Sequence, residues 1–109
     1  MFEQETIKVV VKRPLERGTI EVIENTNEAY KEVIGAEYLD YIVYKGELFE
    51  NTIDCIVDDL GIRKKLEINF NLNCYDIHGT VIFAERDSKG YYIDLSDNSI
   101  EYLKSEGML

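Results

Sequence analysis

The chain has 109 residues, of which 45% are hydrophobic, and it carries 12 Lys and Arg against 22 Asp and Glu, a formal net charge of −10. This length is typical of one domain, and we expect residues 1–109 to form a single one. The excess of carboxylates argues against direct binding to DNA, RNA or anionic lipid, because such proteins neutralise phosphates with a basic surface. We also expect no membrane span and no secretory signal, since the sequence lacks a long apolar run and a basic N-terminal segment.

Two cysteines, Cys55 and Cys74, are too few for a disulfide-rich secreted domain, so we expect a cytoplasmic protein. Cys55 lies in the alternating pattern of residues 53–57 and is predicted to face the core as a small apolar side chain. The sequence has one histidine and no Cys-x-x-Cys or His-x-x-x-His spacing. We therefore predict no metal site, and the absence of a glycine-rich phosphate loop gives no reason to expect a cofactor.

The first predicted elements form a hairpin. Apolar and polar residues alternate over residues 7–12, which predicts a half-buried strand because successive side chains point to opposite faces. Pro14 and Gly18 interrupt the pattern. Alternation resumes over residues 20–22, and we predict a second strand that pairs with the first.

A helix is predicted near residues 26–34. Asn25 stands before it as the expected N-cap, and Glu28 three residues on completes a pattern that is similar to a capping box. Gly35 follows the apolar stripe and provides a stop in the left-handed conformation.

In the rest of the chain, runs rich in β-branched and aromatic residues alternate with turn residues. Strands are predicted at residues 38–44, 47–51, 53–57, 66–72, 80–84 and 91–95, and a helix near 97–106 capped by Ser96 or Asp97. Tight turns are predicted at Lys45-Gly46, residues 58–61 and residues 87–90. Short connections between successive strands imply antiparallel pairing. We predict an α+β domain, a mostly antiparallel twisted sheet with two short helices packed on one face or end.

The sequence resembles a small domain-of-unknown-function family that is met mainly in bacteriophage genes and mobile elements of bacteria. The stretches that carry the resemblance are IKVVVKRP, TIEVIENT, NEAYKEVIGAEYLDYIVY, VDDLGIRKKLEINFNL and YDIHGTVIFAERDSKGYYIDLSDNSIEYL. They cover about residues 6–105. The family's characteristic Asn is matched by Asn69, whereas the Arg that usually follows it is replaced by Phe70. The resemblance implies a protein made in a bacterial host and implies no activity.

Few residues in this sequence are candidates for a catalytic role. His78 is the one imidazole and sits at a turn-to-strand junction, with no Ser or Cys marked as its partner. We therefore expect a protein that is not an enzyme. Asn69, Tyr75, Asp76 and His78 are weak binding candidates, and the alternative is that their hydrogen bonds only tie down a turn beside Gly79.

Eight tyrosines are many for this length. Tyr41 and Tyr44 fall on opposite faces of the strand predicted at residues 38–44. Such side chains suit a protein interface, since they join apolar area to a polar tip. Packing within the core or across strands is the alternative.

Acidic residues are concentrated in residues 18–62, which hold 11 acidic and 2 basic side chains. Glu28 and Glu32 are one helical turn apart and are predicted to be exposed on the same side. The acidity either keeps the protein soluble or forms a face for a basic partner. The residues of that face would be Glu21, Glu28, Glu32, Glu37, Asp40, Glu47 and Glu50.

Three functions stay open. The first is a non-enzymatic accessory protein of a phage or mobile element that binds a host or element protein. The second is an acidic mimic of nucleic acid, which would need carboxylates in rows roughly 6–7 Å apart like phosphates. The third is a small-molecule binder or unrecognised enzyme that uses the region of Asn69, Asp76 and His78, and this would need a concave pocket with converging polar groups.

Overall fold

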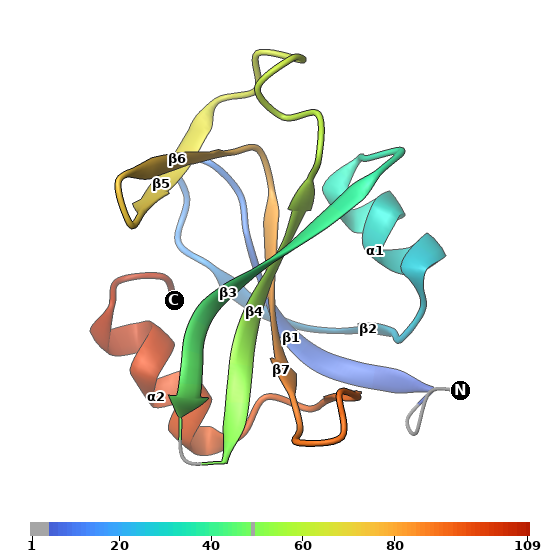
Figure 1. The fold of residues 1–109 in the computed structure, drawn as a ribbon, viewed down its shortest axis with the longest axis vertical. Helices are drawn as coiled ribbons and strands as arrows, with labels where there is room; N and C mark the ends of the chain where they lie inside the picture. The colour runs from blue at the N-terminus through green and yellow to red at the C-terminus, as the bar shows by residue number, and fades with distance from the viewer. Residues whose placement is uncertain (1–4, 49) are drawn as a thin grey trace.

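The computed structural model describes residues 5–48 and 50–109, and Figure 1 shows their fold. In chain order the elements are β1 (Thr6–Lys12), β2 (Thr19–Glu24), α1 (Asn27–Ile34), β3 (Leu39–Leu48), β4 (Asn51–Asp58), β5 (Ile68–Leu72), β6 (Tyr75–His78), β7 (Val81–Arg86), β8 (Tyr92–Ile93) and α2 (Asp97–Ser105). Neither helix has the length and apolar character that a membrane span requires among these described residues.

One six-stranded sheet organises the molecule. Its strands lie in the order β2-β1-β7-β4-β3, and β8 pairs with the end of β7. Strands β5 and β6 form a separate hairpin, and every pairing is antiparallel. The predicted α+β class, with a mostly antiparallel sheet and two short helices, is confirmed.

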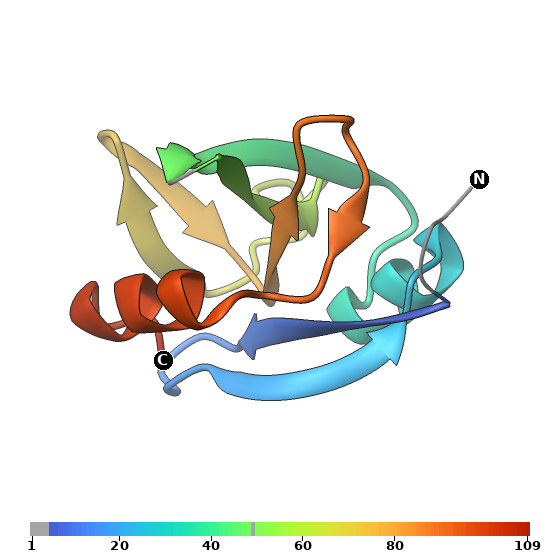
Figure 2. The same cartoon turned by 90° about the horizontal axis from the view of Figure 1, so that it is seen from below.

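The two helices lie on opposite faces of the curved sheet, as Figure 2 shows. On one face, Tyr30 and Ile34 of α1 pack against β1, β4 and β7. On the other, Ile100 and Leu103 of α2 join the β5–β6 hairpin over the same three strands. These central strands are therefore buried on both faces. The prediction of a half-buried first strand is wrong for this reason: Val10 is as buried as its neighbours, and Lys12 is 8% exposed.

The N-cap of helix α1 lies one residue later than predicted. The side-chain oxygen of Thr26 accepts the N–H of Ala29, so Thr26 is the N-cap. Asn25 is instead buried and bonds through its side chain to the hydroxyl of Tyr30. The predicted stop at Gly35 is confirmed, with a φ of 77°.

Strand β3 runs through the turn that was predicted at Lys45-Gly46. The register of β3 against β4 shifts on either side of Lys45, and Glu47 takes a φ of 54°. The residues that predict a turn therefore form irregularities within one strand. A single long strand takes the place of the two strands that were expected at residues 38–44 and 47–51. The alternation of faces along the strand is confirmed, because Ile42 and Tyr44 pack on the α2 side while Leu39 packs on the α1 side.

The β5–β6 hairpin closes over the α2 side of the sheet. Its turn is formed by Asn73 and Cys74, both with positive φ, as a two-residue turn of type I′ requires. The structure thus makes Tyr75–His78 a strand rather than the approach to a turn. A register shift between Ile68 and Phe70 leaves Ile68 half exposed and turns the side chain of Asn69 toward the end of β1.

Candidate functional site

A groove runs between helix α1 and the edge strand β2. We call it the acidic groove; it has a volume of about 530 Å³ and is lined by Arg13, Ile23, Glu24, Glu28, Ala29, Glu32 and Val33. Glu28 and Glu32 are exposed and stand one turn apart, a rise of about 6 Å along the helix. Ile23, Ala29 and Val33 give the groove an apolar floor. The predicted exposure of the two glutamates is confirmed.

The charge of the acidic groove is negative. Three glutamates and one arginine line it, and that arginine, Arg13, is already paired with Glu21, with 3.5 Å between Nη1 and Oε2. Because Arg13 is shared with Glu21, it does not balance the charges of Glu24, Glu28 and Glu32. The groove therefore suits a cationic group more than an anionic one.

Of the rest of the predicted acidic face, Glu21 meets the groove through its ion pair with Arg13, whereas Glu37, Asp40, Glu47 and Glu50 do not line it. Glu47 and Glu50 lie at the far end of the long β3–β4 hairpin from α1 (Figure 1). Asp40 uses its carboxylate to accept the N–H of Tyr41. Glu24, which the sequence reasoning left out, takes a place in the groove because the end of β2 lies beside α1.

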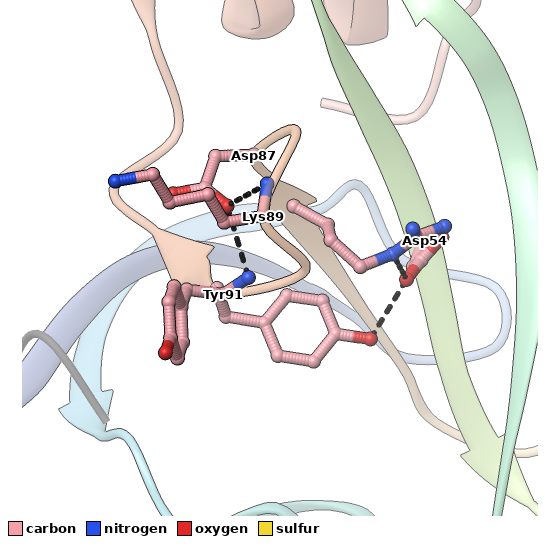
Figure 3. A network of polar contacts seen from close by, with 6 residues as sticks. Asp54, Asp87, Lys89 and Tyr91 are labelled. Atoms are coloured by element: carbon pink, nitrogen blue, oxygen red, sulfur yellow. Dashed lines mark hydrogen bonds and ion pairs between the residues drawn. The ribbon is translucent and has the colours of Figure 1, made fainter. Parts of the chain in front are cut away.

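A second cluster centres on Asp54, which lies at the middle of β4 and is 3% exposed. Its carboxylate accepts two hydrogen bonds from Arg86, at 2.8 Å from Nε and 3.1 Å from Nη2. It also accepts the hydroxyl of Tyr92 at 2.8 Å (Figure 3). Burial, with the hydrogen bond to Asp54 as a smaller cause, raises the pKa of Tyr92 above its ordinary value. The cluster ties β4, β7 and β8 together.

The turn that carries Tyr92 is fixed by Asp87. Its Oδ1 accepts the N–H of Lys89 at 2.9 Å and the N–H of Tyr91 at 3.0 Å (Figure 3). This turn sets the position of the Tyr92 ring. The ring of Tyr41 stacks on it, with 6.4 Å between the two ring centroids. Tyr41 is 44% exposed and donates its hydroxyl to Asn27 at 3.0 Å. Tyr41 is thus an exposed tyrosine held in one orientation.

Tyr44 lies on the other face of β3 and belongs mainly to the core. Its ring meets Phe83, Phe70 and Tyr102 edge-on, with centroids 5.1, 6.0 and 6.3 Å away. Burial is the largest cause that raises its pKa, and the nearby carboxylate of Glu106 adds to it. A cavity of about 500 Å³ opens beside the ring, between β3, the β5–β6 turn and α2.

Asn69 and His78 are brought to the same end of the molecule and are used there for backbone contacts. Asn69 donates to the carbonyls of Lys12 and Gly79, both at 2.8 Å, and its Oδ1 accepts the ammonium of Lys12 at 2.7 Å. His78 bonds through Nδ1 to the carbonyl of Leu66 at 2.9 Å. Burial lowers the pKa of Lys12. This arrangement fastens the β5–β6 hairpin to β1.

Tyr75 and Asp76 lie away from those contacts. Tyr75 is 75% exposed beside the hairpin turn. The exposed carboxylate of Asp76 accepts the side-chain amide of Asn71 at 3.2 Å. Of the four weak candidates, Asn69 and His78 thus hold the hairpin in place, whereas Tyr75 and Asp76 are exposed on it.

A family profile described as a domain of unknown function (DUF3846) matches residues 7–107, nearly the whole chain. The chain belongs to this family. Neither a search of curated proteins nor a search of solved structures found a match. In the described part of this DUF3846 domain, no three His, Cys, Asp or Glu side chains are grouped so that they could hold a metal ion.

The Asp54 cluster of the DUF3846 domain was missed from sequence. One signal could have found it: Asp54 stands in the apolar run Ile53–Val57, and a carboxylate in a buried strand needs a partner. What the sequence could not supply is that partner, because Arg86 and Tyr92 come from strands more than 30 residues away along the chain.

Proposed function

We propose that this DUF3846 domain is a small non-enzymatic binding module whose acidic groove receives a basic segment of a protein partner. The observation that carries the proposal is the lining of the groove by Glu24, Glu28 and Glu32 over an apolar floor. Carboxylates around a concave apolar surface attract lysine or arginine side chains, and the floor can bury their aliphatic stems.

We further propose that the protein is an accessory protein of a phage or mobile element and acts in the cytoplasm of a bacterial host. The support for this context is the sequence resemblance described above and the small number of cysteines. A partner from the host or from the element would fit it equally.

We favour a protein partner over the mimicry of nucleic acid. Glu28 and Glu32 have a phosphate-like spacing of about 6 Å along α1. However, they line a concave groove, whereas a mimic needs carboxylates on a convex ridge that can enter a partner's binding cleft. For a small-molecule function, the region of Asn69 and His78 offers side chains that are already bonded to the backbone.

The test is the capture of proteins from a bacterial lysate by the immobilised chain and by two variants of equal charge. Glu28→Lys with Glu32→Lys reverses the groove. Glu47→Lys with Glu50→Lys makes the same change at the β3–β4 turn. Each double variant moves the net charge from −10 to −6, since each reversal adds two positive charges.

We expect basic proteins to be captured by the wild type and by the β3–β4 variant, and to be lost from the groove variant. Elution at about 1 M salt should release them, because the Debye length falls there to about 3 Å. Equal capture by both variants would show that the groove is not the binding site.

A further inference from the structure

Strand β2 is one edge of the six-stranded sheet, and β3 is the other. The N–H of Asn25 bonds to the carbonyl of Glu5, which fixes which residues of β2 face β1. In the register of Ile7 with Ile23 and Val9 with Glu21, hydrogen-bonded pairs then fall at every second residue. The intervening residues of β2, which are Ile20, Val22 and Glu24, therefore direct their backbone N–H and C=O groups outward.

One outward group further along the same edge is already paired. The N–H of Gly18 bonds to the carbonyl of Met108 at 2.9 Å, as the same alternation requires. The C-terminal segment thus occupies the outward N–H of Gly18, just before β2 begins. Within the described ranges, no strand pairs with the outer edge of β2 beyond it. The edge is ready to accept another strand.

The two sides of this edge differ in chemistry. On one side lie the exposed apolar side chains of Ile20 and Val22, which are 46% and 67% exposed. On the other side stands α1, whose Glu28 and Glu32 line the groove together with Ile23. Both Ile23 and Glu24 line the groove although they point to opposite faces of β2, so the groove reaches the edge itself.

We infer that the partner adds an extended segment to β2 as a further strand, with Lys or Arg at alternate positions and apolar residues between them. The basic side chains face Glu28 and Glu32 of α1, and the apolar ones cover Ile20 and Val22. The backbone of the segment pairs with the outward groups of β2. This inference rests on the proposed function and specifies its mode of binding.

Charge selects a basic strand over a second copy of this chain. Two copies joined through β2 would bring together two chains that each carry a net charge of −10. Like charges across paired strands are destabilising. A basic segment removes this repulsion and balances the groove.

Two short peptides of equal charge serve as probes. One alternates Lys with Val, and the other alternates Lys with Pro and cannot form a ladder because proline lacks the N–H group. Amide hydrogen exchange of the protein is followed by NMR with each peptide. The inward amides of Glu21 and Ile23 are the internal control.

The Lys-Val peptide should slow exchange of the outward amides of Ile20, Val22 and Glu24 by about tenfold or more, since strand addition protects them. The Lys-Pro peptide should leave them unchanged. Equal binding of both peptides, or binding of the Lys-Val peptide without protection of these amides, would overturn strand addition.

A variant pair tests the same point by affinity. Val22→Pro removes an outward N–H and is compatible with an edge strand, while Val22→Thr keeps the N–H and the branched side chain. We expect Val22→Pro to weaken binding of the Lys-Val peptide by about tenfold, the loss of roughly one hydrogen bond, and Val22→Thr to bind almost as the wild type. If Val22→Pro does not fold, the exchange measurement on the wild type decides.

The two proposals fail in different ways. If the Glu28→Lys/Glu32→Lys variant loses the peptide while Val22→Pro retains it, the acidic groove stands and the added strand is refuted. If the groove variant binds the peptide like the wild type, the proposed function is refuted as well.

Discussion

Asp54 and Arg86 form a two-point ion pair between neighbouring strands β4 and β7, with 2.8 and 3.1 Å between the guanidinium nitrogens and the carboxylate oxygens. The Asp54 side chain is 5% exposed and the Arg86 side chain 35%. The pair thus has one partner in the core and one that reaches water.

Replacing Arg86 by leucine should destabilise the fold by about 2–3 kcal/mol, because it leaves a buried carboxylate with only Tyr92 as partner. Arg13→Leu is the matched control, since Arg13 pairs with Glu21 on the surface, and it should change stability by less than about 1 kcal/mol. Urea unfolding at pH 7 measures both. Equal losses would mean that the Asp54 pair contributes no more than a surface pair.

Glu85 makes stability depend on pH. Burial alone would raise its pKa, but hydrogen bonds from Ser96, Ser99 and Asn51 outweigh it and hold the pKa below its ordinary value. A carboxylate with a lowered folded pKa stabilises the fold above its unfolded pKa of about 4.3 and loses this contribution as pH falls through the folded pKa.

Glu85→Gln should therefore lower the free energy of unfolding at pH 7 by about 1–3 kcal/mol, and the difference from wild type should shrink as pH falls below about 4. Glu101→Gln is the control, because Glu101 is exposed on α2. Unfolding is followed at several pH values. A difference that stays constant down to acid pH would show that the ionised form of Glu85 is not what stabilises α2.

The N-terminus of α1 gives a prediction with a close control. Thr26→Ala removes the side-chain oxygen that accepts the N–H of Ala29 and should destabilise the protein by about 1 kcal/mol. Thr26→Ser keeps that oxygen and should stay within about 0.5 kcal/mol of wild type. Thermal unfolding distinguishes them. The same loss in both variants would place the helix cap elsewhere.

Asn69 should act through the fold rather than through a ligand. Asn69→Asp keeps an acceptor for Lys12 but loses both donations to the carbonyls of Lys12 and Gly79, so we expect a loss of about 1–3 kcal/mol. Asn71→Asp, two residues along the same strand, keeps the acceptor for the N–H of Cys74 but replaces an exposed contact with Asp76 by a surface pair of like charges, and it should cost about 1 kcal/mol or less. Urea unfolding compares the two. A folded Asn69→Asp protein of wild-type stability that loses binding would reassign Asn69 to a binding site.

Much of the fold could be predicted because its signals are local. The left-handed stop at Gly35 and a helix cap at Ser96 or Asp97 depend on neighbouring residues alone. The stop is confirmed, and of the two cap candidates Ser96 is the N-cap. The cap of α1 was misplaced by one residue because Asn25 and Thr26 are both good caps. Asn25 is instead held at the end of β2 by the carbonyls of Glu5 and Tyr92, which accept its backbone N–H and its side-chain amide, and no local rule reveals these contacts.

The remaining features depend on pairs that are distant in the sequence. Lys45-Gly46 carries turn chemistry, yet pairing of β3 with β4 continues past it to Leu48. Glu28 and Glu32 could be placed on one exposed helix face from their spacing. Their partner Glu24 could not, because its position depends on how α1 packs beside β2.

The last prediction concerns how the acidic groove finds its partner. Long-range attraction by Glu28 and Glu32 should raise the association rate of a basic ligand, and salt should slow it, since the Debye length falls from about 10 Å at 0.1 M to about 3 Å at 1 M. The double reversal to lysine should reduce the association rate more than it increases the dissociation rate, as changes of rim charges usually do.

Surface plasmon resonance with the immobilised Lys-Val peptide at two salt concentrations measures both rates. The Glu47→Lys/Glu50→Lys variant is the control, because it carries the same net charge and leaves the groove intact. Both glutamates of α1 are exposed, so the reversal should change stability by less than about 1 kcal/mol, including the small loss from a lysine in the first turn. Salt-independent association that neither variant changes would assign the acidity to solubility and make the exposed ring of Tyr41 the next surface to test.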